Sequence, residues 1–369
     1  DEETPRLGDV TVLGRLVFAP GMNATLRCTS LSVFGRLEAG NEMMPLEGTA
    51  SIILWGNTSM RKVNMLNGLD LFGRKAIGIT GNFSMHGRRW NQSWSRMVDT
   101  REPGDIEIEV EGDVSDWANG SEILIGPTEY SGDPFTEGET RFINTSIYDD
   151  TQNLTRISLD RILNQRHTAG TVRGIPLRAV VALMRRSITI AGEQTEPGEP
   201  GSDAFNSVSI VVAGEAEVSM SWVKVEEGGK DAQYRVEPKP ALRWLGAGPI
   251  QGRIHNNLFL DCRAGAVEVM GSNVLLERNT FWRTRGAAIN ASNVSQEMLI
   301  VENLAVGGLM RHAYGDGEYQ PTPAYHMDVL PTRLVGNVAA GGLDIGFQVR
   351  PAPCDAGAAD MFGETPTPL

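Results

Sequence analysis

The sequence predicts an all-β protein, a right-handed parallel β-helix (a solenoid) with lateral loops. Three observations lead to this prediction. Short phrases repeat about every 20–25 residues, apolar and polar residues alternate in short segments, and an asparagine returns at matching positions of successive repeats. A period of this size is typical of solenoids. Strict alternation is typical of strands, whose side chains point to opposite faces in turn.

The first repeat is a glycine followed by a short apolar segment. Gly14–Phe18 is echoed by Gly35–Ala39 after 21 residues, Gly56 follows after another 21, and Gly81 comes 25 later. Leucine-rich repeats use a similar period, but they need a dense leucine frame and a helical return. The alternation in segments such as Ile106–Val110 favours strands instead.

A second repeat, Ile/Leu-x-x-Asn-x-Phe/Ala, occupies the C-terminal half, with its asparagines 22, 24 and 34 residues apart. Asparagine tolerates the left-handed backbone of a tight corner, and asparagines stacked on successive coils can form a hydrogen-bonded ladder. We expect such a ladder at Asn257, Asn279, Asn303 and Asn337. The apolar residues that precede them should point into one core; these are Ile254, Leu276, Ile300 and Leu334.

Composition shifts divide the chain. Residues 1–100 should form the first coils, residues 101–190 a β-rich continuation with long loops, and residues 191–350 the C-terminal coils. The polar stretches 192–204 and 226–240 should be lateral loops, and residues 351–369 a linker or tail. The exposed end coils of a solenoid must be capped or joined to something, so we expect contacts with further protein.

The composition excludes several classes of function. A formal charge of −13 argues against nucleic-acid binding. No apolar run reaches the 18–20 or so residues that a membrane span needs. Three cysteines, Cys28, Cys262 and Cys354, cannot form a disulfide scaffold and leave at least one thiol over. No nucleotide, dinucleotide or metalloprotease motif occurs, and we expect no cofactor.

The acceptor pattern for N-glycosylation, Asn-x-Ser/Thr, occurs nine times, and seven of the sites fall within the first 153 residues. Chance would give about two or three, so the excess indicates a glycoprotein of the secretory pathway, extracellular or at the cell surface. The nine asparagines are Asn23, Asn57, Asn82, Asn91, Asn119, Asn144, Asn153, Asn290 and Asn293.

Candidate catalytic or metal sites are few, and we expect no catalytic residues. The adjacent pair Asp149 and Asp150 fits a solvated turn. His86, His167 and His255 stand apart from obvious partners and fit structural roles, and Arg283 and Arg285 beside Trp282 fit a coil edge. The densest group could bind zinc or calcium or act as an acid/base site, but a polar loop between coils also explains it, together with the 34-residue spacing. Its members are His312, Asp316, Glu318, His326 and Asp328.

Five phrases, in this order, resemble extracellular proteins that carry an eight-glycine (G8) domain followed by parallel β-helix repeats. This group includes fibrocystin-like ectodomains and hyaluronan-degrading proteins of the cell surface and the secreted space. The resemblance spans roughly residues 10–345 and implies that residues 1–100 hold the end of a G8 domain. The phrases are Leu31–Gly40, Pro45–Ala50, Gly78–Gly87, Trp117–Glu129 and Arg178–Ile190.

The chain departs from the enzyme-like members of this group at one place. Where they carry a histidine-rich phrase resembling Ile-His-Phe-His, it has Tyr234–Lys239, which contains no histidine. We therefore expect a non-enzymatic structural or adhesive module, a rigid part of a larger assembly, with other extracellular proteins and glycans as partners. The alternatives are a carbohydrate-binding module or a polysaccharide-degrading enzyme, for which fold analogy is a weak argument.

Overall fold

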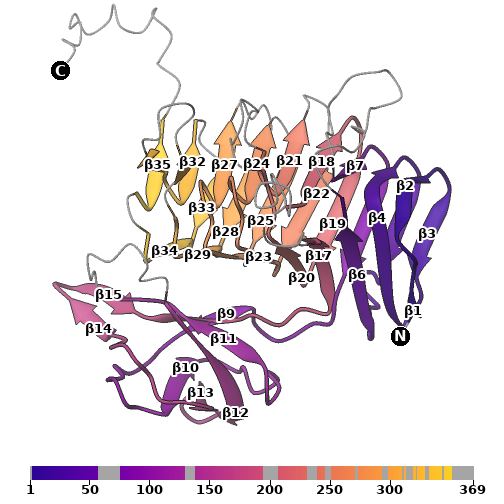
Figure 1. Cartoon of the computed structure of the whole chain (residues 1–369). Helices are drawn as coiled ribbons and strands as arrows, with labels where there is room; N and C mark the ends of the chain where they lie inside the picture. Colours follow the sequence, from indigo (N-terminus) through magenta and orange to yellow (C-terminus); the bar gives the residue numbers. More distant parts are fainter. Residues whose placement is uncertain are drawn as a thin grey trace, which may run out of the picture.

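A computed structural model shows an all-β protein, and the parallel β-helix that the repeats predict is confirmed (Figure 1). The described part of the chain contains no helix, and so none that could cross a bilayer. The structure describes residues 2–56, 75–128, 138–193, 207–230, 239–245, 251–270, 273–292, 298–309, 311–312, 319–320, 322–328, 332–342 and 345–350.

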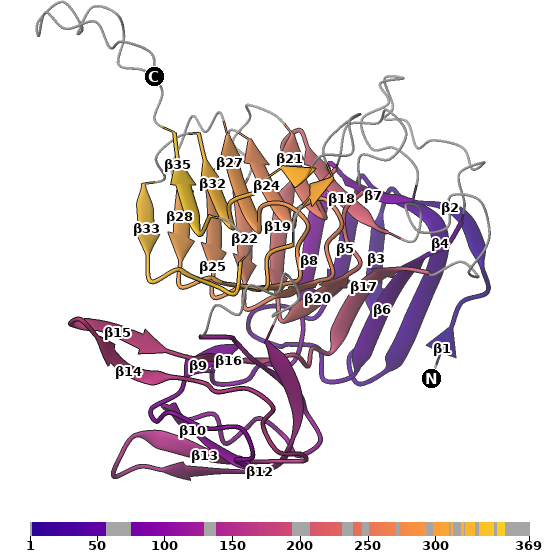
Figure 2. The same cartoon turned by 60° about the vertical axis from the view of Figure 1, so that its left-hand side comes forward.

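The β-helix has three faces, which we name the covered, upper and open faces. β4 (Asn23–Val33) bends at its middle, so its first half belongs to the covered face and its second half to the upper face. From there each complete coil contributes one strand to each face (Figures 1 and 2). The open face is the eight-stranded sheet β3 (Arg15–Phe18), β5 (Arg36–Ala39), β8 (Asn82–His86), β19 (Glu217–Ser221), β22 (Gln251–His255), β25 (Asn273–Glu277), β28 (Met298–Val301) and β33 (Arg333–Val335).

The covered and upper faces together make a seventeen-stranded sheet. After β4, the covered face runs through β6 (Thr49–Leu54), β17 (Ile188–Gly192), β20 (Val223–Glu226), β23 (Leu258–Leu260), β26 (Thr280–Trp282), β29 (Leu304–Val306) and β34 (Val338–Ala340). The upper face runs through β7 (Ala76–Ile79), β18 (Ser209–Ala213), β21 (Leu242–Leu245), β24 (Val267–Met270), β27 (Ile289–Ser292), β32 (Tyr325–Met327) and β35 (Phe347–Val349). At the N-terminal end, β1 (Glu2–Glu3) and β2 (Leu7–Val12) pair with β4.

The alternating pattern of the strands builds one continuous core along the helix. In β19, for example, Val218 and Met220 point inward and Ser219 outward. Equivalent inward residues stack from coil to coil, as in the parallel rings of Phe259 and Phe281, whose centroids are 5.1 Å apart. Burial of these columns supplies the main driving force for folding, because each coil can bury its apolar face only against its neighbours.

The glycine repeat marks a close approach between coils. A Cβ atom at Gly35 would lie 2.1 Å from the Gly14 carbonyl oxygen, and one at Gly81 would lie 2.1 Å from the Gly35 carbonyl oxygen. Real Cβ atoms do not come so close to a backbone atom, so neither position can accept a side chain without moving the backbone. Gly14, the first of the three, has open space around it.

A lateral domain interrupts the coils between β8 and β17 (Figures 1 and 2). Its strands pair antiparallel, and the alternating pattern of residues 101–190 does not by itself predict this topology. β6 and β17 pair directly, Ile188 beside Ala50, so the domain leaves the stack of coils intact. Its six-stranded sheet contains β9 (Trp94–Arg96), β10 (Glu107–Glu111), β11 (Glu122–Ile125), β12 (Glu139–Asp149), β13 (Leu154–Leu159) and β16 (Val180–Leu183). A separate hairpin joins β14 (Ala169–Val172) and β15 (Ile175–Arg178).

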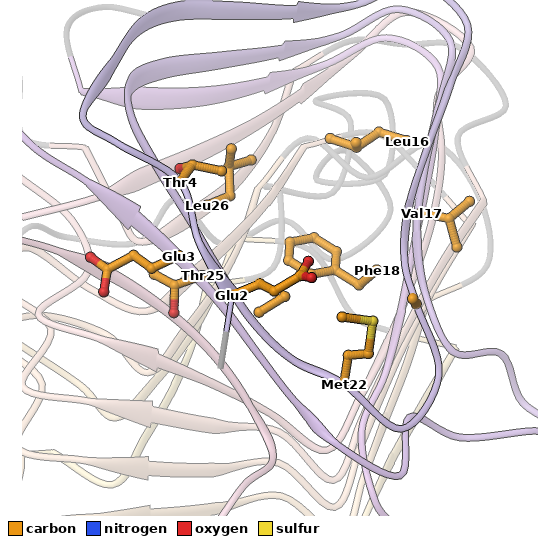
Figure 3. A pocket seen from close by; sticks show the side chains of 11 residues that line it. Glu2, Glu3, Thr4, Leu16, Val17, Phe18, Met22, Thr25 and Leu26 are labelled. Atoms are coloured by element: carbon orange, nitrogen blue, oxygen red, sulfur yellow. The ribbon is translucent and has the colours of Figure 1, made fainter.

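The two ends of the described coils leave apolar side chains uncovered. At the N-terminal end, a cavity of about 640 Å³ is lined by the exposed Met22 and by Phe18 and Leu26, which are buried at its wall (Figure 3). At the C-terminal end, Leu334 pairs in register with Ile300 but is 37% exposed. Ile254, Leu276 and Ile300 lie in the core, whereas Leu334 differs because it belongs to the last described coil.

Candidate functional site

The lateral domain is fixed to the coils along one corner of the β-helix. This corner follows each open-face strand, and its first residue has a left-handed backbone, with φ near 50–70° at Asn256, Arg278, Glu302 and Gly336. A left-handed residue turns its carbonyl oxygen away from the neighbouring strands. The lateral domain donates to three of these oxygens in turn, from Arg186 Nε to Asn256 (2.9 Å), from Ser93 Oγ to Arg278 (2.8 Å) and from Trp94 Nε1 to Glu302 (2.9 Å).

Apolar packing and a buried cation strengthen this contact. Leu124, Val180 and Ala182 of the lateral domain pack against covered-face residues such as Leu258 and Leu304. The Arg186 guanidinium lies 5.0 Å from the Trp222 ring, a cation–π contact. Burial lowers the pKa of Arg186 to about 9, which leaves the side chain charged at neutral pH. The lateral domain is therefore a docked unit rather than a loose loop.

A polar cleft of about 500 Å³ lies beside this corner and is the candidate binding site. Its volume is within the range of small-ligand sites. The coils supply one wall through Arg278 and Glu302, which form an ion pair with N–O 2.6 Å and more than 40% exposure of both side chains. The lateral domain supplies the other wall, with Arg96 lying over the half-buried ring of Trp94 at 5.6 Å. The remaining lining residues are Gln92, Ser93, Ser95, Glu111, Gly112, Asn153 and Gly336.

Sequence reasoning missed this cleft, apart from Asn153, which it named as a sequon. Arg278 and Glu302 each precede a ladder asparagine, so their place at a coil corner could have been inferred from the repeat. Their facing wall comes from a domain inserted far away in the sequence, and no spacing rule connects the two.

The four pattern asparagines stack inside this corner. Each of Asn257, Asn279 and Asn303 donates from Nδ2 to the Oδ1 of the next asparagine, at 3.1, 2.9 and 3.0 Å, and from its backbone N–H to the same oxygen. The Nδ2 groups also donate to the carbonyl of a core residue in the preceding coil. Asn257, Asn279 and Asn303 are fully buried with their hydrogen bonds satisfied, so the ladder is structural.

The sequon asparagines lie on different surfaces. Asn23, Asn91, Asn119, Asn144 and Asn153 are exposed, the last three within the lateral domain and Asn91 at its start. Asn82 on β8 and Asn290 on β27 are half-buried. Asn57 and Asn293 lie outside the described residues.

The dense polar group, in which the sequence offered a possible metal or acid/base site, is only partly described. Its members are His312, Asp316, Glu318, His326 and Asp328. His326 Nε2 lies 3.3 Å from an Asp328 oxygen on the upper face. His312 belongs to β30 (Arg311–His312), which pairs with β31 (Tyr319–Gln320) in a short hairpin between coils. Asp316 and Glu318 lie outside the described residues, as do residues 234–238 of the phrase Tyr234–Lys239. Within the described ranges no three His, Cys, Asp or Glu residues are grouped as metal ligands would be.

Two of the histidines, His86 and His255, lie on the open face on either side of Ser221. His86 Nδ1 lies 2.8 Å from Ser221 Oγ, and His255 follows Ser221 in the next coil. Burial, and then the neighbouring His255, lowers the pKa of His86 to about 4. Burial also lowers the pKa of His255. Both rings are therefore neutral at neutral pH, with Glu42 and Arg253 paired above them at 2.9 Å.

His167 belongs to a buried ionic network in the lateral domain. Its Nε2 lies 2.7 Å from Glu139 Oε1 and its Nδ1 lies 3.0 Å from the Gly126 carbonyl oxygen. Glu139 also pairs with Arg141. Burial raises the pKa of Glu139, but the hydrogen bond from His167, the Asn164 N–H and Arg141 outweigh it and hold that pKa below its usual range.

Several of the other side chains named from the sequence have local partners. Asp149 accepts hydrogen bonds from Thr151 and Gln152 within an exposed turn. Arg283 pairs with Asp261 at 2.5 Å and lies over Trp282. Cys28 and Cys262 are buried free thiols, and burial raises the pKa of Cys28 to about 12. Cys354 lies outside the described residues.

The sequence of this chain is similar to those of known proteins. The sequence model of the G8 domain matches residues 1–98. Fibrocystin-L of Mus musculus is 24% identical over 363 residues, which cover 91% of this chain and 8% of that protein. Fibrocystin of Canis lupus familiaris is 24% identical over 96% of this chain and 8% of its own length. Protein rliB of Dictyostelium discoideum is 24% identical over 90% of this chain and 30% of its own length. The chain thus spans less than a tenth of the two fibrocystins.

Among solved structures, the tailspike gp61 of Pseudomonas phage phi297 gives a TM-score of 0.24 at 7% identity, covering 74% of this chain and 42% of that one. The Gp54 tailspike of Acinetobacter baumannii bacteriophage AP22 gives 0.23 at 10% identity, covering 91% and 65%. The fold assignment rests on the strand pairing described above. Residues 1–98 match the G8 domain, the fold is a parallel β-helix, and the chain is similar in sequence to fibrocystin and fibrocystin-L.

Proposed function

We propose that this chain is a non-enzymatic structural or adhesive module of a secreted or cell-surface glycoprotein, a rigid part of a larger assembly. The observation that carries the proposal is the unequal use of the three faces. One face is covered by the lateral domain, whereas the open face of the C-terminal coils is a flat parallel sheet free of sequons.

The sequons support an extracellular location. Five of the asparagines are exposed, and four of these lie at the start of the lateral domain or within it. Glycans there would shield that side of the molecule, because an N-glycan is bulky and hydrated. Strands β22, β25, β28 and β33 of the open face contain no acceptor asparagine, so glycans would leave them accessible.

The outward residues of the open face suit protein contact. Leu275, Leu299 and Val301 are half-buried apolar residues on adjacent strands, and Arg253 and Glu277 stand beside them. A small apolar centre with charged neighbours is the composition of a typical non-obligate interface. We propose other extracellular proteins of the same assembly as the partners.

Blocking the open face with a glycan tests the adhesive role. The double substitution Leu299→Asn with Val301→Thr creates a sequon at the middle of this face. The control, Arg173→Asn with Ile175→Thr, places one at the tip of the β14–β15 hairpin, where Arg173 and Gly174 both have positive φ and Asn-Gly is favoured. Beads coated with each secreted protein are compared for attachment to cell layers and to deposited matrix.

We expect the open-face glycan to abolish attachment and the hairpin glycan to leave it unchanged. Equal attachment by both glycosylated variants would show that the open face is not the contact surface. The alternatives are tested with the unmodified protein, incubated with hyaluronan and other acidic polysaccharides. Shortening of the polysaccharide chains would reveal a depolymerase and overturn the non-enzymatic proposal. Binding of the intact polysaccharide to the protein would indicate a carbohydrate-binding module.

A further inference from the structure

One sequon asparagine lines the cleft between the lateral domain and the coils. Asn153 begins the sequence Asn153-Leu154-Thr155 at the entry to β13, and its side chain is exposed at the cleft wall. Its Oδ1 accepts a hydrogen bond from Tyr148 Oη at 3.0 Å, which fixes the orientation of the amide. Its Nδ2, the atom that carries the sugar in an N-glycoprotein, donates to no described residue.

Other sequon asparagines use that nitrogen within the protein. Four of them donate from Nδ2, Asn82 to Glu217, Asn91 to Asp113, Asn144 to the Leu159 carbonyl and Asn290 to Glu268. Asn119 resembles Asn153 in having no described Nδ2 partner, but it lies on an exposed turn beside Gly120. Asn153 therefore combines an available acceptor nitrogen with a position in a cleft.

The cleft has the chemistry that holds a sugar. Trp94 and the Arg96 guanidinium that lies over its half-buried ring line one wall together, so that pyranose C–H groups can pack on the exposed part of the indole and hydroxyl groups can bond to Arg96. The indole nitrogen is already bonded to the Glu302 carbonyl. Arg278 and Glu302 offer charged donors and acceptors for hydroxyl and acetamido groups. Their ion pair is exposed and contributes little to stability, so a ligand can take over its hydrogen bonds at small cost.

We propose that the cleft is the seat of the chain's own N-glycan at Asn153, with the first N-acetylglucosamine held between Trp94 on one wall and the Arg278–Glu302 pair on the other. The inference rests on the proposed extracellular function, which supplies the glycan. Attached to the lateral domain and packed on two coil corners, the sugar would bridge the two parts of the molecule. It would extend the contact that Ser93 and Trp94 already make with the same corners.

The experiment measures glycan release from the folded chain of 369 residues, secreted by eukaryotic cells, with a peptide-N-glycosidase that cuts at the asparagine. Occupancy and release at each sequon are followed by mass spectrometry of glycopeptides, with Asn119 as the internal control. We expect release at Asn153 to be at least about tenfold slower than at Asn119, because the bond becomes accessible only when the sugar leaves the cleft. In denatured protein the two rates should be equal.

Wall variants distinguish a seated glycan from one that is protected in another way. Arg278→Ser with Glu302→Ser removes the exposed side chains of the coil wall and leaves the Glu302 carbonyl that binds Trp94. Trp94→Leu removes the aromatic surface of the facing wall while keeping an apolar side chain. Both variants should bring release at Asn153 close to the rate at Asn119. Thermal unfolding of each variant checks that the fold is retained.

Two kinds of failure are separable. If no sequon carries a glycan in secreted protein, the proposed extracellular function is wrong. If other sequons are occupied but Asn153 is bare, or if it is released as fast as Asn119, this inference alone is wrong. It is also wrong if slow release at Asn153 persists in both wall variants.

Discussion

The coils and the lateral domain hold themselves together in different ways. The coils repeat one solution, in which apolar columns, left-handed corners and the asparagine ladder join each coil to the next. The lateral domain has a single antiparallel core and a buried ionic network that occurs once. A defect in the coils should therefore spread along the stack to neighbouring coils, whereas a defect in the network should unfold one compact unit.

Among the substitutions that distinguish the lateral domain from the coils, we expect Glu139→Gln to have the largest effect on stability. The substitution removes the charge that Arg141 and His167 share in a nearly solvent-free site, and the stranded cation should cost about 3–5 kcal/mol. Hydrogen exchange should rise across β10–β13 and stay slow in the coils from β20 onward. Glu102→Gln is the control, because its pair with Arg166 is exposed and is worth less than about 1 kcal/mol. Uniform loss of protection in both parts would mean that they do not unfold separately.

A methyl group at the glycine corner tests the coils. Gly35→Ala places a Cβ against the Gly14 carbonyl oxygen, and since backbone atoms cannot rotate away, we expect a loss of about 3 kcal/mol in the free energy of unfolding. Gly14→Ala is the matched control at the equivalent position with open space, and should be nearly neutral. Urea unfolding of the two variants makes the comparison. Equal stabilities would show that the coils are not as closely stacked as described.

The asparagine ladder should be stronger within the stack than at its end. Asn279→Ala leaves both the Asn257 donors and the Ile254 carbonyl without their partner, at a cost of roughly 2–3 kcal/mol. Asn337→Ala, in the last described coil, removes a partner from Asn303, Ile300 and Val335, and water can replace it, so the loss should be below about 1 kcal/mol. Chemical denaturation gives both values. A larger loss at Asn337 would contradict the nearest-neighbour picture.

Acid should weaken the open face through its buried histidines. The pKa of His86 is lower in the folded chain than in the unfolded chain, so between about pH 6.5 and pH 4 the unfolded state binds more protons. Stability should therefore fall as the pH falls through this range, by up to about 1.4 kcal/mol per pH unit for this group. His86→Gln removes the titrating ring and should flatten the slope. An unchanged slope in that variant would assign the acid sensitivity to other groups.

The coils were predictable because each coil packs in the same way, so that the same residue types recur at equivalent positions of the repeat. The spacing of Asn257, Asn279 and Asn303 follows the coil length, and the stretch to Asn337 follows the inserted β30–β31 hairpin. The lateral domain left no such mark. Its antiparallel pairs join strands that share no motif. The sequence does not distinguish Glu139 from a surface carboxylate, although the fold buries it beside His167.

The candidate cleft was predictable only in part. The sequon at Asn153 was visible, and the corner position of Arg278 and Glu302 follows from the ladder asparagines behind them. The side chains meet because an inserted domain returns the chain to the next coil. That return depends on tertiary packing of Leu124, Val180 and Ala182 on the covered face, which a local pattern does not encode.

The lateral domain is inserted between two adjacent coils, so that β6 and β17 are neighbours although the domain separates them in sequence. Ser51 pairs with Thr189, and Thr189 pairs with Lys224 one coil further on. Neighbouring strands are about 4.8 Å apart, within reach of a disulfide, whereas two steps exceed the limit of roughly 7 Å. Mild oxidation should therefore cross-link Ser51→Cys with Thr189→Cys, as shown by peptide mapping, and leave Ser51→Cys with Lys224→Cys open. The reverse result would contradict the account.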